Sequence, residues 1–262
     1  MLVRGWGGAG RGADAVRSAV RLAGAVVTRT WLATYCRLRV HGRANLPAAG
    51  SFVIVANHAS HLDALCLLAA LPLGRLGRAF PAAAADYFFA SPVAGALSGL
   101  FLNALPFARK GRVRQTLDAC RELLAEDGNV LILFPEGTRS TSGETGEFKS
   151  GVGELVAGTG VPVVPCYLAG GHRAMPKGSW FPRPRKLELF IGRLMRFDDL
   201  ERSRANASLI AMELESAVRQ LAAGPVTEGS PSDERYIGIA DVRSDHRPRR
   251  ARRGARPRLA TC

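Results

Sequence analysis

The sequence predicts an α/β fold: a mixed, largely parallel sheet flanked by helices, with an N-terminal amphipathic helical segment. Two short apolar runs carry this prediction, at residues 52–56 and 129–134. Short apolar runs rich in β-branched residues are typical of strands buried on both faces, as in parallel sheets covered by helices. Segments with helical periodicity separate the predicted strands, which is typical of α/β proteins.

The first predicted helix covers residues 13–35. Apolar residues recur there at three- or four-residue steps, with Arg17, Arg21 and Arg29 between them. This pattern predicts an amphipathic helix. Two interpretations are equally favoured: a helix packed on its own domain, and a helix that lies on a membrane surface. A short strand is expected next, at residues 38–41.

The helix that follows the first buried strand is predicted at residues 62–71 and ends before Pro72. The stretch 79–107 carries Asp86 as its single charge, so its length alone would allow a membrane span. Small and helix-breaking residues interrupt this stretch, which favours a core strand near Phe80 and a short helix at 91–102. The remaining predicted elements are helices at 113–126, 148–157 and 205–221 and strands at 161–168 and 187–191.

A chain of 262 residues is long enough to bury a full core as one domain. We predict an N-terminal helical, membrane-associating segment at 1–37, an α/β domain at 38–222 and a disordered basic tail at 223–262. The formal net charge is +14. Residues 243–262 hold eight arginines and one aspartate, so they contribute +7 of this charge. A basic excess favours polyanions, and because no nucleic-acid motif accompanies it, we expect an anionic membrane surface and no nucleic acid as partner.

The five cysteines are scattered and include no C-x-x-C pair. This spacing predicts a reducing compartment and argues against a disulfide framework or a thiolate metal site. No signal peptide is evident, because Arg21 and Arg29 interrupt the apolar N-terminal stretch. We therefore expect a peripheral protein at the cytoplasmic face of a membrane.

Polar residues follow both buried strands at the points where the strands end. Asn57 and His58 follow the first strand, and Asp63 comes five residues after His58; the second strand runs into Pro-Glu-Gly-Thr-Arg-Ser at 135–140. In open α/β sheets the ligand crevice lies outside the carboxyl ends of the strands, so we expect the two blocks to meet. A carboxylate near a histidine holds one ring nitrogen protonated and leaves the other free to accept a proton. The sequence thus predicts a base with an orienting partner.

These blocks resemble those of the glycerolipid acyltransferase family, the PlsC-type 1-acylglycerol-3-phosphate acyltransferases. The first family block matches at Asn57, His58 and Asp63, and the third matches throughout residues 134–140. The fourth, a Val-Pro-hydrophobic-Pro block, matches at 161–165. A His-X4-Asp motif alone is weak, but together with the third block it is specific. The resemblance covers roughly residues 35–220.

The second family block departs from the family pattern. The family places an aromatic residue three positions before an arginine, whereas this chain has Pro106 there, Phe107 next and Arg109 last. The resemblance still implies that Arg109, with Lys110, assists in binding the acceptor.

The resemblance implies an O-acyltransferase that moves a fatty acyl group from a thioester, acyl-CoA or acyl carrier protein, to the free hydroxyl of a lysophospholipid. The expected acceptor is 1-acylglycerol-3-phosphate and the expected product phosphatidic acid. His58 would act as general base and Asp63 would orient it. No metal and no cofactor is implied besides the acyl thioester as co-substrate. The further residues expected to bind substrate are Arg109, Glu136, Gly137, Thr138 and Arg139.

Arg139 is assigned by the resemblance to the phosphate of the acceptor, and an arginine suits a phosphate because its planar fork donates two parallel hydrogen bonds. For Glu136 two roles are open: contact with the glycerol, or pairing with Arg139. Backbone N–H groups near Gly137 are expected to stabilise the oxyanion.

Two other functions are alternatives. The first is a metal-dependent hydrolase that uses His58, His61 and Asp63; such a site needs further ligands, and the sequence shows no second cluster. The second is a non-catalytic protein that binds anionic membranes, which an intact His–Asp pair disfavours. The other histidines are His41, His172 and His246.

Overall fold

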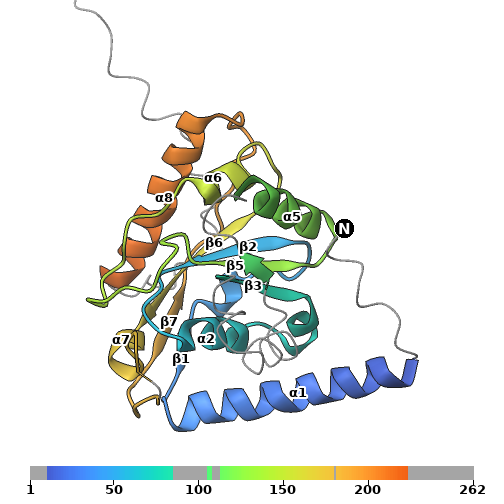
Figure 1. Ribbon diagram of the computed structural model, residues 1–262, viewed down its shortest axis with the longest axis vertical. Helices are drawn as coiled ribbons and strands as arrows, with labels where there is room; N and C mark the ends of the chain where they lie inside the picture. Colours follow the sequence, from blue (N-terminus) through green and yellow to red (C-terminus); the bar gives the residue numbers. More distant parts are fainter. Residues whose placement is uncertain (1–10, 85–104, 108–112, 180, 224–262) are drawn as a thin grey trace, which may run out of the picture. The chain divides into compact units, whose positions relative to one another are not determined.

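The structure, a computed structural model, describes residues 11–84, 105–107, 113–179 and 181–223. Seven strands of this part of the chain form one sheet, in the order β1-β7-β6-β2-β5-β3-β4 (Figure 1). The strands from β6 to β4 are parallel to one another, β7 is antiparallel to β6, and β1 is parallel to β7. This sheet confirms the predicted fold class. The strands are β1 (Arg39–His41), β2 (Phe52–Ala56), β3 (Ala79–Ala84), β4 (Leu105–Phe107), β5 (Val130–Leu133), β6 (Val163–Ala169) and β7 (Glu188–Ile191).

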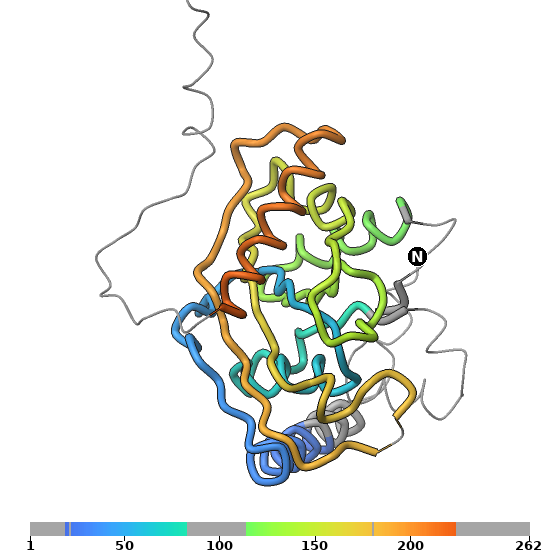
Figure 2. The backbone as a smooth tube through the Cα atoms, turned by 90° about the vertical axis from the view of Figure 1, so that its left-hand side faces the viewer, coloured from blue at the N-terminus to red at the C-terminus, as the bar shows by residue number. Residues whose placement is uncertain are grey.

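Helices cover both faces of the sheet. Figures 1 and 2 show from two sides that α1 and α2 lie on one face, whereas α5, α6 and α8 lie on the other. The helices predicted within the described residues are confirmed to within a few residues at their ends, while α7 and the strand β4 were not predicted. The helices are α1 (Arg11–Thr34), α2 (Leu62–Ala70), α5 (Val113–Ala125), α6 (Gly151–Val156), α7 (Gly171–Ala174) and α8 (Arg204–Ala223), with 3-10 turns η2 (Arg43–Asn45) and η3 (Leu73–Arg78).

The central strand β2 is apolar at every position because both of its faces are covered by helices. All five of its residues are buried. Side chains alternate between the two faces of a strand. Phe52 and Ile54 pack in the core shared with α1 and α2, whereas Val53 and Val55 pack in the core shared with α5, α6 and α8. Burying each such side chain contributes about 1.5–3 kcal/mol, so both faces of β2 stabilise the domain.

The N-terminal helix α1 contacts the domain through its C-terminal half. Leu32 is fully buried in the core shared with α2, and Trp31 packs against it. The guanidinium of Arg29 donates to the carbonyl of Leu71, at the end of α2. Among the helices that the structure describes, none is both long and apolar enough to cross a membrane.

The topology brings the carboxyl ends of β2, β5 and β6 to the same edge of the sheet, because these strands are parallel neighbours. The side chain of Asn57 continues the hydrogen bonding between β2 and β6 beyond the end of β2. Its Nδ2 donates to the carbonyl of Leu168 at 3.1 Å, and its Oδ1 accepts the N–H of Leu168 at 2.7 Å. His58 follows directly and so starts at a fixed place. The predictions that fall outside the described residues are the helix at 91–102, the positions of Arg109 and Lys110, and the tail beyond residue 223.

Candidate active site

His58 and Asp63 form a hydrogen-bonded pair at the edge where β2 ends. The Nδ1 of His58 donates to Asp63 Oδ2 at 2.9 Å. The His58 side chain is 23% exposed and that of Asp63 is 2% exposed. An acceptor on Nδ1 selects the tautomer in which Nε2 carries no proton. Among the described residues no other group forms a hydrogen bond with the His58 ring. The unprotonated Nε2 is therefore available as a proton acceptor at this edge.

Asp63 also shapes the loop that carries His58. Its Oδ2 accepts the backbone N–H of Ala59 at 2.7 Å and that of Ser60 at 2.8 Å. Asp63 lies in the first turn of α2, where the helix dipole favours a negative charge. The same carboxylate therefore fixes the loop conformation and the orientation of the imidazole.

The loops that follow β2 and β5 meet, as the rule for strand ends predicts. The backbone N–H of His58 donates to Glu136 Oε1 at 2.9 Å, and the carbonyl of His58 accepts the N–H of Ser140 at 2.8 Å. The His58 ring stacks on Phe134 with 4.2 Å between ring centroids. His58 is thus held by its ring, its amide and its carbonyl.

Glu136 links the two loops from a buried position. The residue is 7% exposed, and besides the N–H of His58 its carboxylate accepts a backbone hydrogen bond from Gly146. Burial raises the pKa of this carboxyl, while the two backbone donors act in the opposite direction. These contacts make Glu136 a positioning residue, which is a role that neither sequence alternative had named.

The turn after β5 requires a glycine. Gly137 has φ of 70°, and a Cβ there would lie 2.5 Å from Lys149 Nζ. The N–H of Gly137 donates to the carbonyl of Phe134 at 3.0 Å. The N–H of Gly137 itself is therefore used within the turn, and the expectation that other backbone N–H groups near Gly137 stabilise the oxyanion stays a prediction.

Arg139 lies within electrostatic range of the histidine block. Burial lowers the pKa of His61, and the positive charge of Arg139 lowers it further. Ser140, the residue after Arg139, donates its N–H to the carbonyl of His58 at 2.8 Å, so the loop that carries Arg139 lies against the histidine block. The spacing of the two sequence blocks predicted this meeting.

Sequence reasoning assigned no role to two basic residues at this edge. Lys149 reaches back from the start of α6 to the Gly137 turn, and its backbone N–H donates to the carbonyl of Pro135 at 3.1 Å. His172 follows β6, and a Cβ on Gly143 would lie 3.0 Å from its side chain. The rule for strand ends, applied to the third parallel strand, would have pointed to His172.

The alternative of a metal-dependent hydrolase requires a set of metal ligands, and residues 11–84, 105–107, 113–179 and 181–223 contain none. Within these ranges no three histidine, cysteine, aspartate or glutamate side chains are grouped so that they could hold a metal ion. Asp63 Oδ2 is moreover engaged by the His58 ring and by two backbone N–H groups.

Comparison with known proteins agrees with this geometry. Residues 37–169 match the family model described as Acyltransferase, which covers about half of the chain and contains the whole His58–Asp63 and 134–140 arrangement. The chain belongs to the acyltransferase family. Its members are transferases, so the site at the edge of the sheet is a candidate active site of a group-transfer enzyme.

Individual members of the acyltransferase family show how far the similarity extends. A chloroplastic 1-acyl-sn-glycerol-3-phosphate acyltransferase of Arabidopsis thaliana is 36% identical over 55% of this chain and 39% of its own length. The 1-acyl-sn-glycerol-3-phosphate acyltransferase alpha of Homo sapiens is 31% identical over 51% of this chain and 46% of its own. The match thus spans less than half the length of these curated relatives.

The present chain is similar to a solved structure over most of its length. The crystal structure of the 1-acyl-sn-glycerophosphate (LPA) acyltransferase PlsC from Thermotoga maritima superposes with a TM-score of 0.59 at 26% identity. It covers 82% of this chain and 85% of the other. The similarity of fold therefore reaches beyond the residues that the family model matches.

Proposed function

We propose that this acyltransferase transfers a fatty acyl group from a thioester to the free hydroxyl of 1-acylglycerol-3-phosphate, and so forms phosphatidic acid. The observation that carries the proposal is the 2.9 Å bond between His58 Nδ1 and Asp63 Oδ2, beside a cationic loop. The relatives that are named as 1-acyl-sn-glycerol-3-phosphate acyltransferases support the choice of acceptor.

His58 acts as the general base in the proposed reaction. Its Nε2 takes the proton of the acceptor hydroxyl while that oxygen attacks the thioester carbonyl, and Asp63 stabilises the imidazolium that forms. The tetrahedral intermediate then collapses: the carbon–sulfur bond breaks, and the thiolate receives the proton from His58. The products are an ester and a free thiol, and no acyl-enzyme intermediate is needed.

Arg139 binds the phosphate of the acceptor in this proposal. A phosphate held beside the histidine block places the neighbouring glycerol hydroxyl within reach of His58, and such positioning lowers the barrier of a bimolecular step. Gly137 and Thr138 shape the loop on which the acceptor lies, and Arg109 and Lys110 add positive charge. Positive charge at Lys149 favours the same anion.

The decisive test of the proposed function is product formation by the full chain. Purified protein, acyl-CoA and lysophosphatidic acid are expected to give phosphatidic acid and free CoA. A panel of lysolipids without a free phosphomonoester is expected to give much less product, and a chelator is expected to have no effect. Absence of thioester release with every acceptor contradicts the proposal, and loss of release with chelator favours the metal-dependent alternative.

The same protein is proposed to work as a peripheral protein on the cytoplasmic, anionic face of a membrane, because its acceptor and product are lipids. The net charge of +14 favours an anionic surface. Four large apolar side chains of α1 are at least 41% exposed. Apolar side chains on an exposed helix suit the boundary between headgroups and acyl chains. These residues are Val20, Leu22, Val26 and Val27.

Vesicle binding tests the membrane proposal with a matched pair of variants. Val27 on α1 is 67% exposed and Met212 on α8 is 71% exposed. Val27→Asp is expected to weaken binding to vesicles that contain anionic phospholipid, whereas Met212→Asp is expected to bind like wild type. Equal binding of all three proteins argues against a membrane role of α1. Removing residues 243–262 tests the basic tail in the same assay.

A further inference from the structure

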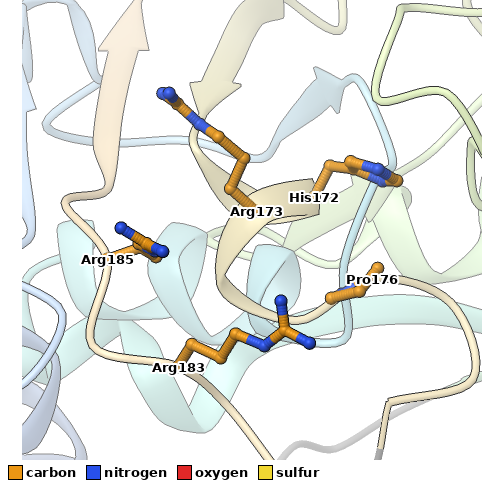
Figure 3. A pocket seen from close by; sticks show the side chains of 5 residues that line it. All are labelled: His172, Arg173, Pro176, Arg183 and Arg185. Carbon is orange, nitrogen blue, oxygen red and sulfur yellow. The ribbon is translucent and has the colours of Figure 1, made fainter.

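A basic pocket lies next to the candidate active site, where β6 ends. Its cavity has a volume of about 360 Å³, which lies within the range of small-molecule sites, about 300–1,000 Å³. Figure 3 shows that α7 carries two of its lining residues and that the segment leading back to β7 carries the others. The lining residues are His172, Arg173, Pro176, Arg183 and Arg185. No residue of this pocket belongs to the sequence blocks discussed above.

The charge of the pocket is uncompensated within the described residues. None of the guanidinium groups of Arg173, Arg183 and Arg185 forms an ion pair there. Glu188, the nearest carboxylate along the chain, is engaged by Lys186 at 2.9 Å and by His41 at 3.5 Å. A single exposed arginine is usually solvated, but three around one cavity form a site for an anion.

The backbone holds the pocket in shape. The N–H of Arg183 donates to the carbonyl of Ala174 at 2.7 Å, which ties the returning segment to α7. The Tyr35 hydroxyl donates to the carbonyl of Pro182 at 3.1 Å and so fastens the same segment to the residue that follows α1. A preformed site loses less conformational entropy when it binds a ligand.

The pocket is close to the base but does not adjoin the reacting atoms directly. Gly171, the first residue of α7, packs so closely on Asp63 that a Cβ would lie 2.8 Å from Oδ1, while His58 is bonded to Oδ2. The Asp63 carboxylate thus separates the imidazole from α7, and the pocket begins at the next residue, His172. A ligand that reaches both places must be longer than the headgroup of the acceptor, whose phosphate is adjacent to its glycerol.

We infer that this pocket binds the phosphate groups of a coenzyme A thioester, the diphosphate together with the 3′-phosphate, while the pantetheine arm extends toward His58. The inference rests on the proposed function, which supplies the thioester. Coenzyme A combines several phosphates with a long neutral arm that separates them from the reacting sulfur. The proposal divides the anions between two places: the acceptor phosphate at Arg139, and the donor phosphates at Arg183, Arg185 and Arg173.

Binding of free coenzyme A tests the pocket without relying on turnover. We compare the wild-type full chain, the double variant Arg183→Ala/Arg185→Ala and the control Arg193→Ala, whose exposed arginine lies outside the pocket. The double variant is expected to raise the Kd for coenzyme A at least about tenfold, and the control to change it less than about twofold. Removal of the 3′-phosphate from the ligand is expected to weaken binding to wild type more than binding to the double variant. Unchanged coenzyme A affinity in a double variant with a normal thermal transition overturns the inference.

Steady-state kinetics separate the donor from the acceptor. In the double variant the KM for acyl-CoA is expected to rise at least about tenfold, while the KM for lysophosphatidic acid stays within about twofold. A rise confined to the KM for lysophosphatidic acid overturns the inference, because the pocket then binds the acceptor or another lipid headgroup. An equal loss with acyl-carrier-protein donors also overturns it, since an acidic protein surface is then the ligand. If wild type binds coenzyme A through these arginines but acylates no lysolipid, the proposed function fails and the pocket assignment stands.

Discussion

The backbone N–H of His58 donates to Glu136 Oε1 at 2.9 Å, and this bond joins the loops that follow β2 and β5. The two residues are 78 positions apart in the chain. Because Glu136 is buried and also accepts a backbone hydrogen bond from Gly146, it holds three segments at one point. The place of the imidazole therefore depends on a carboxylate that does not touch its ring.

Replacing His58 with alanine is expected to abolish acyl transfer without unfolding the protein. Loss of a general base typically lowers the rate by about 10²–10⁴-fold. The partly exposed ring contributes little to the core, so the thermal transition should be near that of wild type. Release of thiol from acyl-CoA measures the rate, with the exposed His41→Ala as control. Near-normal turnover in a folded His58→Ala protein ends the proposed mechanism.

Asp63→Asn is expected to lower kcat by a comparable factor, about 10²–10⁴, because an amide no longer selects the tautomer with an unprotonated Nε2. This variant should also be less stable, since Oδ2 accepts two backbone N–H groups in addition to the ring. Thiol release and thermal unfolding are measured on the same preparation. A variant that loses stability but keeps its kcat shows that Asp63 is purely structural.

Arg139 is expected to select the acceptor by its phosphate. Arg139→Ala should reduce kcat/KM for lysophosphatidic acid far more than for an acceptor without phosphate. Arg139→Lys keeps the charge but loses the bidentate fork, so it should lie between alanine and wild type. The comparison requires kcat/KM for both acceptors in all three proteins. An equal loss for the two acceptors means that Arg139 supports the loop and does not recognise the phosphate.

Glu136 should make the stability of the protein depend on pH in a recognisable direction. Burial raises the pKa of this carboxyl, so the folded protein binds the proton more tightly than the unfolded chain. Its contribution to the free energy of unfolding is therefore fully present below the ordinary pKa of a glutamate and is lost as pH rises through the raised pKa. The difference in unfolding free energy, wild type minus Glu136→Gln, should decline from about pH 4 upward.

Urea unfolding of both proteins across a pH series measures this difference, and the comparison cancels the titration of groups that the two proteins share. A difference that is flat or that rises with pH contradicts the assignment of the raised pKa to Glu136.

The contact between α6 and α8 should not tolerate a side chain at Gly153. A Cβ there would lie 2.1 Å from the carbonyl oxygen of Ala207, a backbone atom that cannot move aside. Gly153→Ala is expected to lower the free energy of unfolding by about 1–3 kcal/mol or more, as other overpacked cores do. Gly151, two residues earlier in the same helix, has open space around its Cβ position. Gly151→Ala should be neutral or stabilise by about 0.4–1 kcal/mol, and equal effects of the two substitutions would contradict the packing assignment.

Much of the fold was predictable because burial leaves a direct trace in composition. A strand covered on both faces must be apolar throughout, so Phe52–Ala56 and Val130–Leu133 were recognised from the sequence. The pairing of His58 with Asp63 was predictable for a related reason, since both lie within one loop and the first turn of a helix. Short elements were harder: α7 has four residues and β4 has three, which leaves little periodicity to detect.

By itself the sequence determined the class of the sheet, the pairing of His58 with Asp63, and the loop with Arg139 that meets them. These features depend on local spacing and on one rule about strand ends. The tertiary structure alone decided that Glu136 binds the amide of His58, that the N–H of Gly137 is consumed in its turn, and that Arg183 and Arg185 surround a cavity with His172. Such contacts join residues that are far apart in the chain, and the order of strands in the sheet, which no local pattern encodes, sets which of them meet.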